Sequence, residues 1–231
     1  MTRPIIIGVA GAHSGAGKTV YASLILRRFP EWGAIKCTKT GLYCSLVDDP
    51  ETLMEEGKDT RRMIDSGAER VMWVQSPPSD LGDVLPMAVE RLSDLKGIVV
   101  EGNSAIEFLS PDIIIFIFGG DARNIKADAR DILHKADVVV LEGEIPLELP
   151  KGAKVLGRSE SDYKAFLEYI EEMVEAKEQI RSLLKKKSVH GKIPCPVARK
   201  IAEELDVRFR EVGKIADELD IKITDCELGC F

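Results

Sequence analysis

The sequence predicts an α/β fold with a mainly parallel sheet between helices, followed by a small helical C-terminal domain. Short apolar runs alternate with amphipathic segments as far as residue 157, and the runs are continuously apolar, as in strands covered on both faces. Beyond residue 157 the pattern changes to one long, charge-laced amphipathic segment and then to two short helical patterns. The predicted domains are 1–158, a connecting helix over 159–188, and a small domain over 189–231.

The first elements are predicted from local residue patterns. The run 4–11 is rich in β-branched residues and ends in glycine, which predicts a strand, and 17–29 carries apolar residues at helical spacing. The run 32–37 predicts a second buried strand. The polar segment 38–57 has neither pattern and is predicted as a loop.

The remaining elements of this region alternate in the same way. The segment 58–67 predicts a helix that Gly67 closes, and the turn residues of 77–80 announce a helix over 81–95. A further helix is predicted over 122–135. The other predicted strands are 71–75, 97–101, 112–118, 137–142 and 153–156.

The composition is that of an ordinary soluble globular protein. Of the 231 residues, 45% are hydrophobic and 31% are charged, and the net charge is -7. The longest apolar run, around 113–118, is too short to cross a bilayer, and residues 1–11 lack the features of a secretory signal, so we expect a cytoplasmic protein without a membrane partner. The negative charge argues against a surface that binds nucleic acid throughout, although the stretch from Arg181 onward is slightly basic.

The turn after the first predicted strand fits the phosphate-loop pattern, with alanine in place of the first glycine. Its glycines let successive backbone N–H groups point inward at phosphate oxygens, and the positive end of the following helix adds to the attraction. A glycine-rich turn can also bind nothing, but here the required strand and helix flank it. We therefore predict a P-loop fold whose phosphate-binding residues are Ala12, His13, Ser14, Gly15, Ala16, Gly17, Lys18 and Thr19.

The same pattern assigns roles to individual side chains. Lys18 is predicted to contact the β- and γ-phosphates, and Thr19 to ligate Mg²⁺. Such a loop needs an acidic residue near the magnesium, typically at the end of a neighbouring hydrophobic strand. Glu101 ends the run 97–101 and is predicted as that ligand, with Lys18 and Glu101 as the catalytic residues; the alternative is a carboxylate that only faces solvent. Glu142 has the same form and ranks second.

The sequence does not specify which loop residues ligate the metal or which base the bound nucleotide carries. Asp48 and Asp49 lie where switch segments of such proteins reach the metal, and they can equally be solvated turn residues. The guanine-reading signature is missing, because Asn124, Lys126 and Asp128 have the wrong spacing. Either GTP or ATP is therefore compatible with the sequence.

Three segments resemble the molybdopterin-guanine dinucleotide biosynthesis protein B (MobB) family. They are the phosphate loop, the Lys-Asp-Thr helix that runs into a Gly-Ala turn over 57–69, and the strand end 100–102. The second segment is the most specific, and the resemblance covers roughly residues 4–157. It implies GTP binding with slow hydrolysis, in partnership with a molybdenum-cofactor guanylyltransferase that attaches GMP to molybdopterin.

The segment after the second predicted strand departs from this family. Members usually have a lysine followed by a histidine-rich loop, whereas 35–40 keeps the lysine and lacks the histidines. Cys37 and Cys44 occupy that loop instead. A relative that acts on another cofactor or metal is therefore the alternative.

The segment 196–221 fits a helix-turn-helix, in which the second helix can enter a DNA major groove. Asp206 stands at the turn position that glycine usually takes. The basic residues that the second helix offers to DNA are Arg208, Arg210 and Lys214. The carboxylates that oppose them are Glu211, Asp217 and Glu218. A unit for dimerisation or partner docking is the alternative that we favour, and we expect a homodimer.

Cysteines gather in the same C-terminal unit. Cys195, Cys226 and Cys230, with His190, can form a four-ligand zinc or iron-sulfur site. Three residues separate the last two cysteines, whereas zinc pairs commonly have two, so thiols without a metal are the alternative. His134 lies on an amphipathic segment and is predicted to be structural.

Three functions follow from these predictions. The first is an accessory GTPase in molybdenum-cofactor biosynthesis, with slow Mg²⁺-dependent hydrolysis. The second is a nucleotide-gated DNA-binding regulator that uses the C-terminal helix pair. The third is a metal-cluster maturation NTPase that uses the cysteines.

Overall fold

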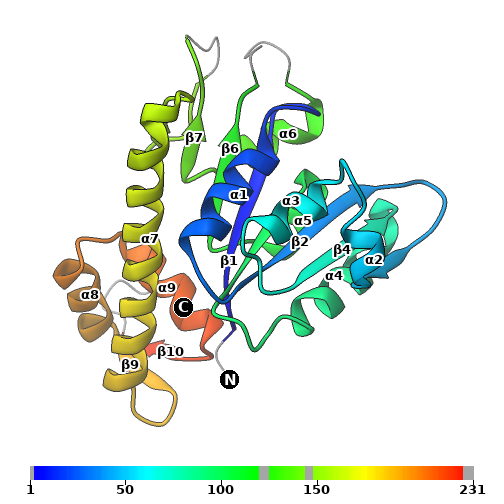
Figure 1. Cartoon of the computed structure of the whole chain (residues 1–231). Helices are drawn as coiled ribbons and strands as arrows, with labels where there is room; N and C mark the ends of the chain where they lie inside the picture. The colour runs from blue at the N-terminus through cyan, green and yellow to red at the C-terminus, as the bar shows by residue number, and fades with distance from the viewer. Residues whose placement is uncertain (1–2, 120–124, 144–147, 226–231) are drawn as a thin grey trace. The chain divides into compact units, whose positions relative to one another are not determined.

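The structure is a computed structural model that describes residues 3–119, 125–143 and 148–225 (Figure 1). The chain divides into two compact units, Arg3–Leu167 and Glu168–Phe231. The long helix α7 (Glu160–Lys187) begins in the first unit and continues in the second. None of the helices in the described ranges has the length and apolarity needed to span a membrane.

The first unit is built on an eight-stranded sheet with the order β3-β4-β2-β5-β1-β6-β7-β8. Every neighbouring pair is parallel except β3 and β4, which are antiparallel. The predicted α/β class with a mainly parallel sheet is thus confirmed. The strands are β1 (Ile5–Gly11), β2 (Trp32–Lys39), β3 (Ser45–Val47), β4 (Val71–Ser76), β5 (Gly97–Glu101), β6 (Ile113–Ile117), β7 (Val138–Val140) and β8 (Lys154–Leu156).

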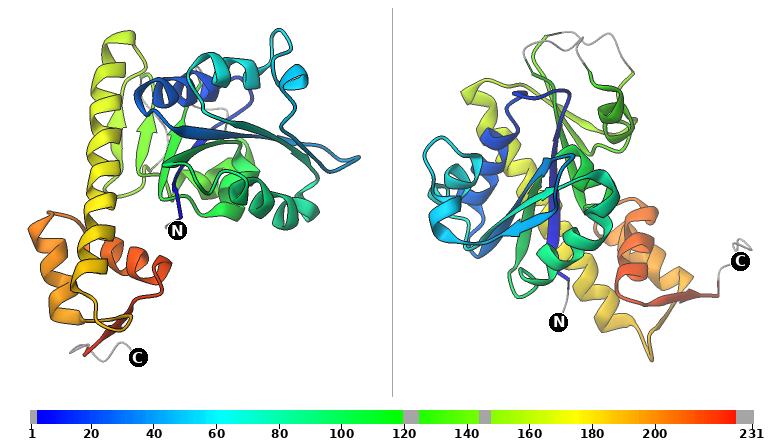
Figure 2. Two further views of the ribbon diagram at one scale, coloured as in Figure 1. Left: turned by 60° about the horizontal axis from the view of Figure 1, so that its bottom comes forward. Right: turned by 90° about the vertical axis from the view of Figure 1, so that its right-hand side faces the viewer.

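Helices cover both faces of this sheet, which explains why its central strands are continuously apolar. Helices α1 (Lys18–Arg28) and α3 (Asp59–Asp65) pack on one face, and α4 (Leu81–Glu90), α5 (Asn103–Leu109) and α6 (Ala127–Leu133) pack on the other (Figure 2). Strand β1 is buried along its whole length. Strands β2, β5 and β1 are neighbours in the sheet and run parallel, so their carboxyl ends meet at one end of the sheet, where the phosphate loop begins.

The segment predicted as the loop 38–57 contains regular structure, so that prediction is wrong. Strand β2 extends to Lys39, strand β3 pairs with the edge of β4, and a short helix α2 (Pro50–Leu53) follows. Asp49 caps α2 by accepting hydrogen bonds from the N–H groups of Glu51 and Thr52. A three-residue strand is too short for a recognisable period, and it forms because β4 offers unpaired backbone groups.

Three helices also differ from the prediction. Helix α5, directly after Gly102, was not predicted, and the helix predicted over 81–95 ends at Glu90. The turns that follow Glu90 continue the chain to β5 without α-helical backbone. Helix α6 is described only from Ala127, whereas the prediction began at 122.

The second unit packs α8 (Cys195–Glu204) and α9 (Phe209–Glu218) against the C-terminal part of α7. Both helices lie where the sequence predicted them, and Asp206 occupies the turn between them with a left-handed φ of 52°. A short parallel ladder joins β9 (Lys192–Pro194) to β10 (Lys222–Thr224), and this pair was not predicted. The buried core of the unit consists of Ile180, Leu184, Ile193, Ala198, Ile201, Ala202, Val212, Ile215, Ala216 and Ile221.

Candidate functional site

The phosphate loop links β1 to α1 and has the backbone that an anion-binding turn requires. Gly15 and Gly17 adopt left-handed φ values of 79° and 99°, which side-chain-bearing residues rarely adopt. Gly17 is the N-cap of α1, and no side chain caps the helix. The first N–H groups of a helix have no intrahelical partner, so those of Lys18 and Thr19 are available to an anion.

Hydrogen bonds from neighbouring elements hold the start of the loop. The side-chain amide of Asn103 donates to the Gly11 carbonyl at 2.9 Å and accepts from the Gly11 N–H at 3.0 Å. The Ala12 N–H donates to the Ile117 carbonyl at 2.9 Å. Asn103 was missed by the sequence reasoning, although it follows Glu101 and Gly102 directly at the strand end.

Lys18 lies over this loop and forms no ion pair with a carboxylate of the residues that the structure describes. Its ammonium donates to the His13 carbonyl at 3.3 Å. Burial lowers the pKa of Lys18, and the nearby charge of Glu101 opposes this only in part. A poorly solvated ammonium that holds only a carbonyl oxygen is well suited to bind a phosphate.

His13 lies beside Lys18, with its ring against the opposite side of the loop. Its Nδ1 is 2.7 Å from the Ser14 carbonyl, and its buried Nε2 has no hydrogen-bond partner among the described residues. A Cβ at Gly119 would lie 2.2 Å from this Nε2, so the His13 ring could keep this position only beside a glycine.

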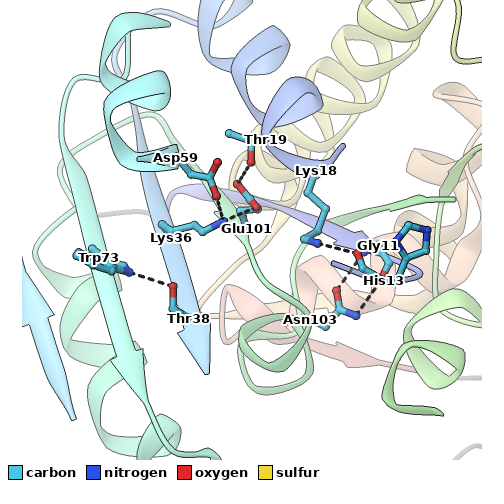
Figure 3. A network of polar contacts seen from close by, with 10 residues as sticks. All are labelled: Gly11, His13, Lys18, Thr19, Lys36, Thr38, Asp59, Trp73, Glu101 and Asn103. Atoms are coloured by element: carbon cyan, nitrogen blue, oxygen red, sulfur yellow. Dashed lines mark hydrogen bonds and ion pairs between the residues drawn. The ribbon is translucent and has the colours of Figure 1, made fainter. Parts of the chain in front are cut away.

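A four-residue network stands at the carboxyl ends of β2 and β5 (Figure 3). The Thr19 hydroxyl donates to Glu101 Oε2 at 3.0 Å. Lys36 Nζ donates to Glu101 Oε1 and to Asp59 Oδ2, each at 2.6 Å. The Glu101 side chain is only 2% exposed, so its charge is satisfied within the protein rather than by water.

The charges in this network stabilise one another. Burial disfavours the Lys36 ammonium, but the charge of Glu101 and the hydrogen bonds to both carboxylates outweigh burial and raise the pKa of Lys36. Burial similarly opposes the ionised form of Asp59, and the hydrogen bond and charge of Lys36 outweigh it and lower the pKa of Asp59. The sequence reasoning placed Glu101 at a strand end, as observed, but assigned no chemical role to Asp59, which lies in a segment that resembles MobB, or to Lys36, the lysine kept in the segment 35–40 that departs from MobB.

The oxygen atoms of this network suit a magnesium ion. Thr19 supplies a hydroxyl, and Glu101 and Asp59 supply carboxylates, which are the hard ligands that Mg²⁺ uses together with substrate phosphates. The predicted pair Thr19 and Glu101 is thus brought together, and Asp59 joins it. Cys37 follows Lys36 on β2, and burial raises the pKa of its thiol to about 11.

Next to the network, the same face of the sheet carries half-exposed polar and aromatic side chains. Trp73 Nε1 donates to Thr38 Oγ1 at 3.0 Å (Figure 3). The Lys58 ammonium lies 4.5 Å from the centre of the Trp73 ring. Ser45 donates to Gln75 at 3.0 Å.

The other acidic candidates have partners elsewhere. Asp48 pairs with Arg91 at 2.6 Å, and Asp49 caps α2, so neither carboxylate reaches the network in this structure. Glu142 is exposed after β7. The hypothesis that Asp48 and Asp49 approach the metal therefore finds no support in their contacts.

The C-terminal metal and DNA predictions are not tested by the described residues. Cys195 is half-buried at the first position of α8, and Cys226 and Cys230 lie outside the described residues. Within 3–119, 125–143 and 148–225, no group of three or more His, Cys, Asp or Glu side chains is placed to hold a metal ion. Arg208 forms an ion pair with Glu211 at 2.7 Å. The negative charge of Glu211 reduces the attraction that Arg208 would offer to DNA phosphates.

Comparison of the sequence with protein-family models and with curated proteins gives no match. Among solved structures, the chain is similar to the crystal structure of HypB from Helicobacter pylori in complex with nickel. The TM-score is 0.39 and the identity is 10%, over 75% of this chain and 88% of that chain. A similarity of this extent carries no argument about family or ligand, so the resemblance to MobB stays a prediction.

Proposed function

We propose that the first unit binds a nucleoside triphosphate with Mg²⁺ and hydrolyses it slowly. The observation that carries the proposal is the Thr19–Glu101 hydrogen bond of 3.0 Å, at the end of a helix whose N-terminal N–H groups have no side-chain cap. The residue after the loop lysine is thereby joined to a buried strand-end carboxylate, which is the arrangement that a P-loop site needs.

The reaction needs no covalent intermediate. The loop N–H groups hold the phosphates, and the Lys18 ammonium exchanges the His13 carbonyl for phosphate oxygens, a stronger charge-assisted partner. Bound Mg²⁺ supplies neutralisation of the charge that develops on the transferring phosphoryl group. Glu101 and Asp59 orient the site through their hydrogen bonds with Thr19 and Lys36.

We further propose GTP as the nucleotide and a molybdenum-cofactor guanylyltransferase as the partner. This finer assignment is supported by the residues that resemble MobB, because the Lys-Asp-Thr segment contributes Asp59 to the network. The strand end that resembles this family contributes Glu101. Two of the resembling segments thus have side chains in the same site as the phosphate loop.

Calorimetric titration with GTP and with ATP, each with Mg²⁺, tests both levels of the proposal. We expect binding that Lys18→Ala weakens about tenfold to a hundredfold, since a hydrogen bond to a charged group contributes about 1.5–3 kcal/mol. Lys135→Ala, an exposed lysine at the end of α6, is the matched control and should bind as the wild type does. No heat with either nucleotide refutes the P-loop assignment, and equal affinity for both refutes the GTP assignment alone.

A further inference from the structure

Lys36 occupies the space between the two carboxylates of the candidate site. Its ammonium comes from β2, whereas Asp59 begins α3 and Glu101 ends β5. The two N–O distances are both 2.6 Å, and the Lys36 side chain is 16% exposed. An ammonium in this position makes charge-assisted hydrogen bonds to the oxygens that a divalent cation would use.

Electrostatics explains why a cation is built in at this place. The Glu101 side chain is 2% exposed, and a buried carboxylate without a partner is strongly destabilising. Lys18 does not neutralise it by contact, because its ammonium holds the His13 carbonyl instead. The chain without a nucleotide therefore depends on Lys36 to balance Glu101 and Asp59.

The same ammonium hinders a metal ion. A divalent cation at the carboxylates would stand within a few ångströms of Lys36, and like charges at such distances repel strongly where little water screens them. One ammonium beside two carboxylates also leaves a single net negative charge, which attracts a free cation weakly. A triphosphate adds negative charge on the far side of Thr19. Only when the nucleotide is present is the negative charge of the site large enough to balance a second cation beside Lys36.

We propose that Lys36 is an internal cation that keeps the Glu101–Asp59 position closed to divalent metal until a nucleotide arrives. Lys36 then releases the two carboxylates, and its ammonium becomes available to the terminal phosphate. The inference rests on the proposed function for its second step, whereas the first step concerns the nucleotide-free chain alone. The nucleotide therefore arrives before the metal ion or together with it, and the metal ion does not bind first.

Binding of Mn²⁺ to the full chain without nucleotide tests the first step, measured from the electron paramagnetic resonance signal of free Mn²⁺ at pH 8. Lys36→Met removes the charge and keeps an unbranched side chain that is one heavy atom shorter, so we expect its Mn²⁺ affinity to exceed that of the wild type by about tenfold or more. Lys36→Arg keeps the charge and should bind as weakly as the wild type. Lys39→Met changes an exposed lysine of the same strand and should also match the wild type.

A second measurement guards against a variant that folds poorly. The unfolding temperature of Lys36→Met should rise when Mn²⁺ is added, whereas that of the wild type should not change. Should Lys36→Met fail to fold, Lys36→Gln keeps a hydrogen-bond donor without the charge and carries the same expectations. Equal Mn²⁺ affinity in the neutral variant and the wild type would overturn the proposal, as would tight Mn²⁺ binding by the nucleotide-free wild type.

The two proposals can fail separately. If the wild type binds neither GTP nor ATP but the neutral variant gains Mn²⁺ affinity, the proposed function fails and the lysine-closed cation position stands. If the wild type binds nucleotide but the neutral variant gains no Mn²⁺ affinity, the role of Lys36 fails and the nucleotide site stands.

Discussion

Replacement of Glu101 by glutamine probes the centre of the site with almost no change in shape. The carboxylate accepts from Thr19 at 3.0 Å and from Lys36 at 2.6 Å, one donor on each oxygen. Glutamine offers one oxygen, which can accept from Lys36, and one NH₂ group, which can donate to the Thr19 hydroxyl once that hydroxyl turns to accept, but it brings no negative charge to a side-chain environment that is 2% exposed. We expect the free energy of unfolding to fall by about 2–4 kcal/mol, because the hydrogen bond to Lys36 loses its ionised acceptor and the half-buried ammonium loses part of its countercharge.

Urea denaturation at neutral pH, followed by circular dichroism, measures this loss. Glu107→Gln is the matched control, since Glu107 is an exposed residue of α5 only a few positions further along the chain. Its free energy of unfolding should stay within about 0.5 kcal/mol of the wild type. A Glu101→Gln protein that is as stable as this control would refute the reasoning, because Glu101 would then not be the buried acceptor of two donors.

Three further predictions concern the surroundings of this residue. The pKa of Asp59 is lowered in the folded chain. Its contribution to stability is therefore present above the ordinary pKa of 3.8 and is lost as pH falls through the folded pKa. The difference in unfolding free energy between the wild type and Asp59→Asn should shrink below pH 3.8, measured by denaturation at a series of acid pH values. The raised pKa of about 11 keeps Cys37 a neutral thiol at pH 8, so iodoacetamide followed by peptide mass spectrometry should label exposed Cys44 first, and faster labelling of Cys37 would contradict its burial. Gly102 has a φ of 141°, and a Cβ there would lie 2.9 Å from the Cys37 carbonyl oxygen; Gly102→Ala should lose about 1–3 kcal/mol in urea denaturation, whereas Gly41→Ala, with open space around it, should not.

Local patterns were sufficient to predict the strand, glycine turn and helix of β1 and α1 and the strand-end carboxylate that contacts Thr19. Glycine spacing sets the backbone of the turn, and a buried strand that ends in a carboxylate is visible as an apolar run before Glu101. The class of the sheet followed from continuous apolar runs for the same reason. Where the pattern was short, as in β3, or where it began directly after a strand, as in α5, the prediction failed because such elements are stabilised by their neighbours rather than by their own sequence.

The sequence by itself therefore determined the glycine turn between β1 and α1, since the conformational demands of Gly15 and Gly17 are local. The tertiary structure alone decided which charged groups surround it. Strand β2 lies between β4 and β5, and this order places Lys36 beside Glu101, which is 65 positions away in the chain. Helix α3 brings Asp59 to the same ammonium, because its apolar face must pack against the sheet while its first residue points toward the strand ends. Contacts of this kind depend on the order of strands and the direction of helices, which burial of the whole core selects and no single segment encodes.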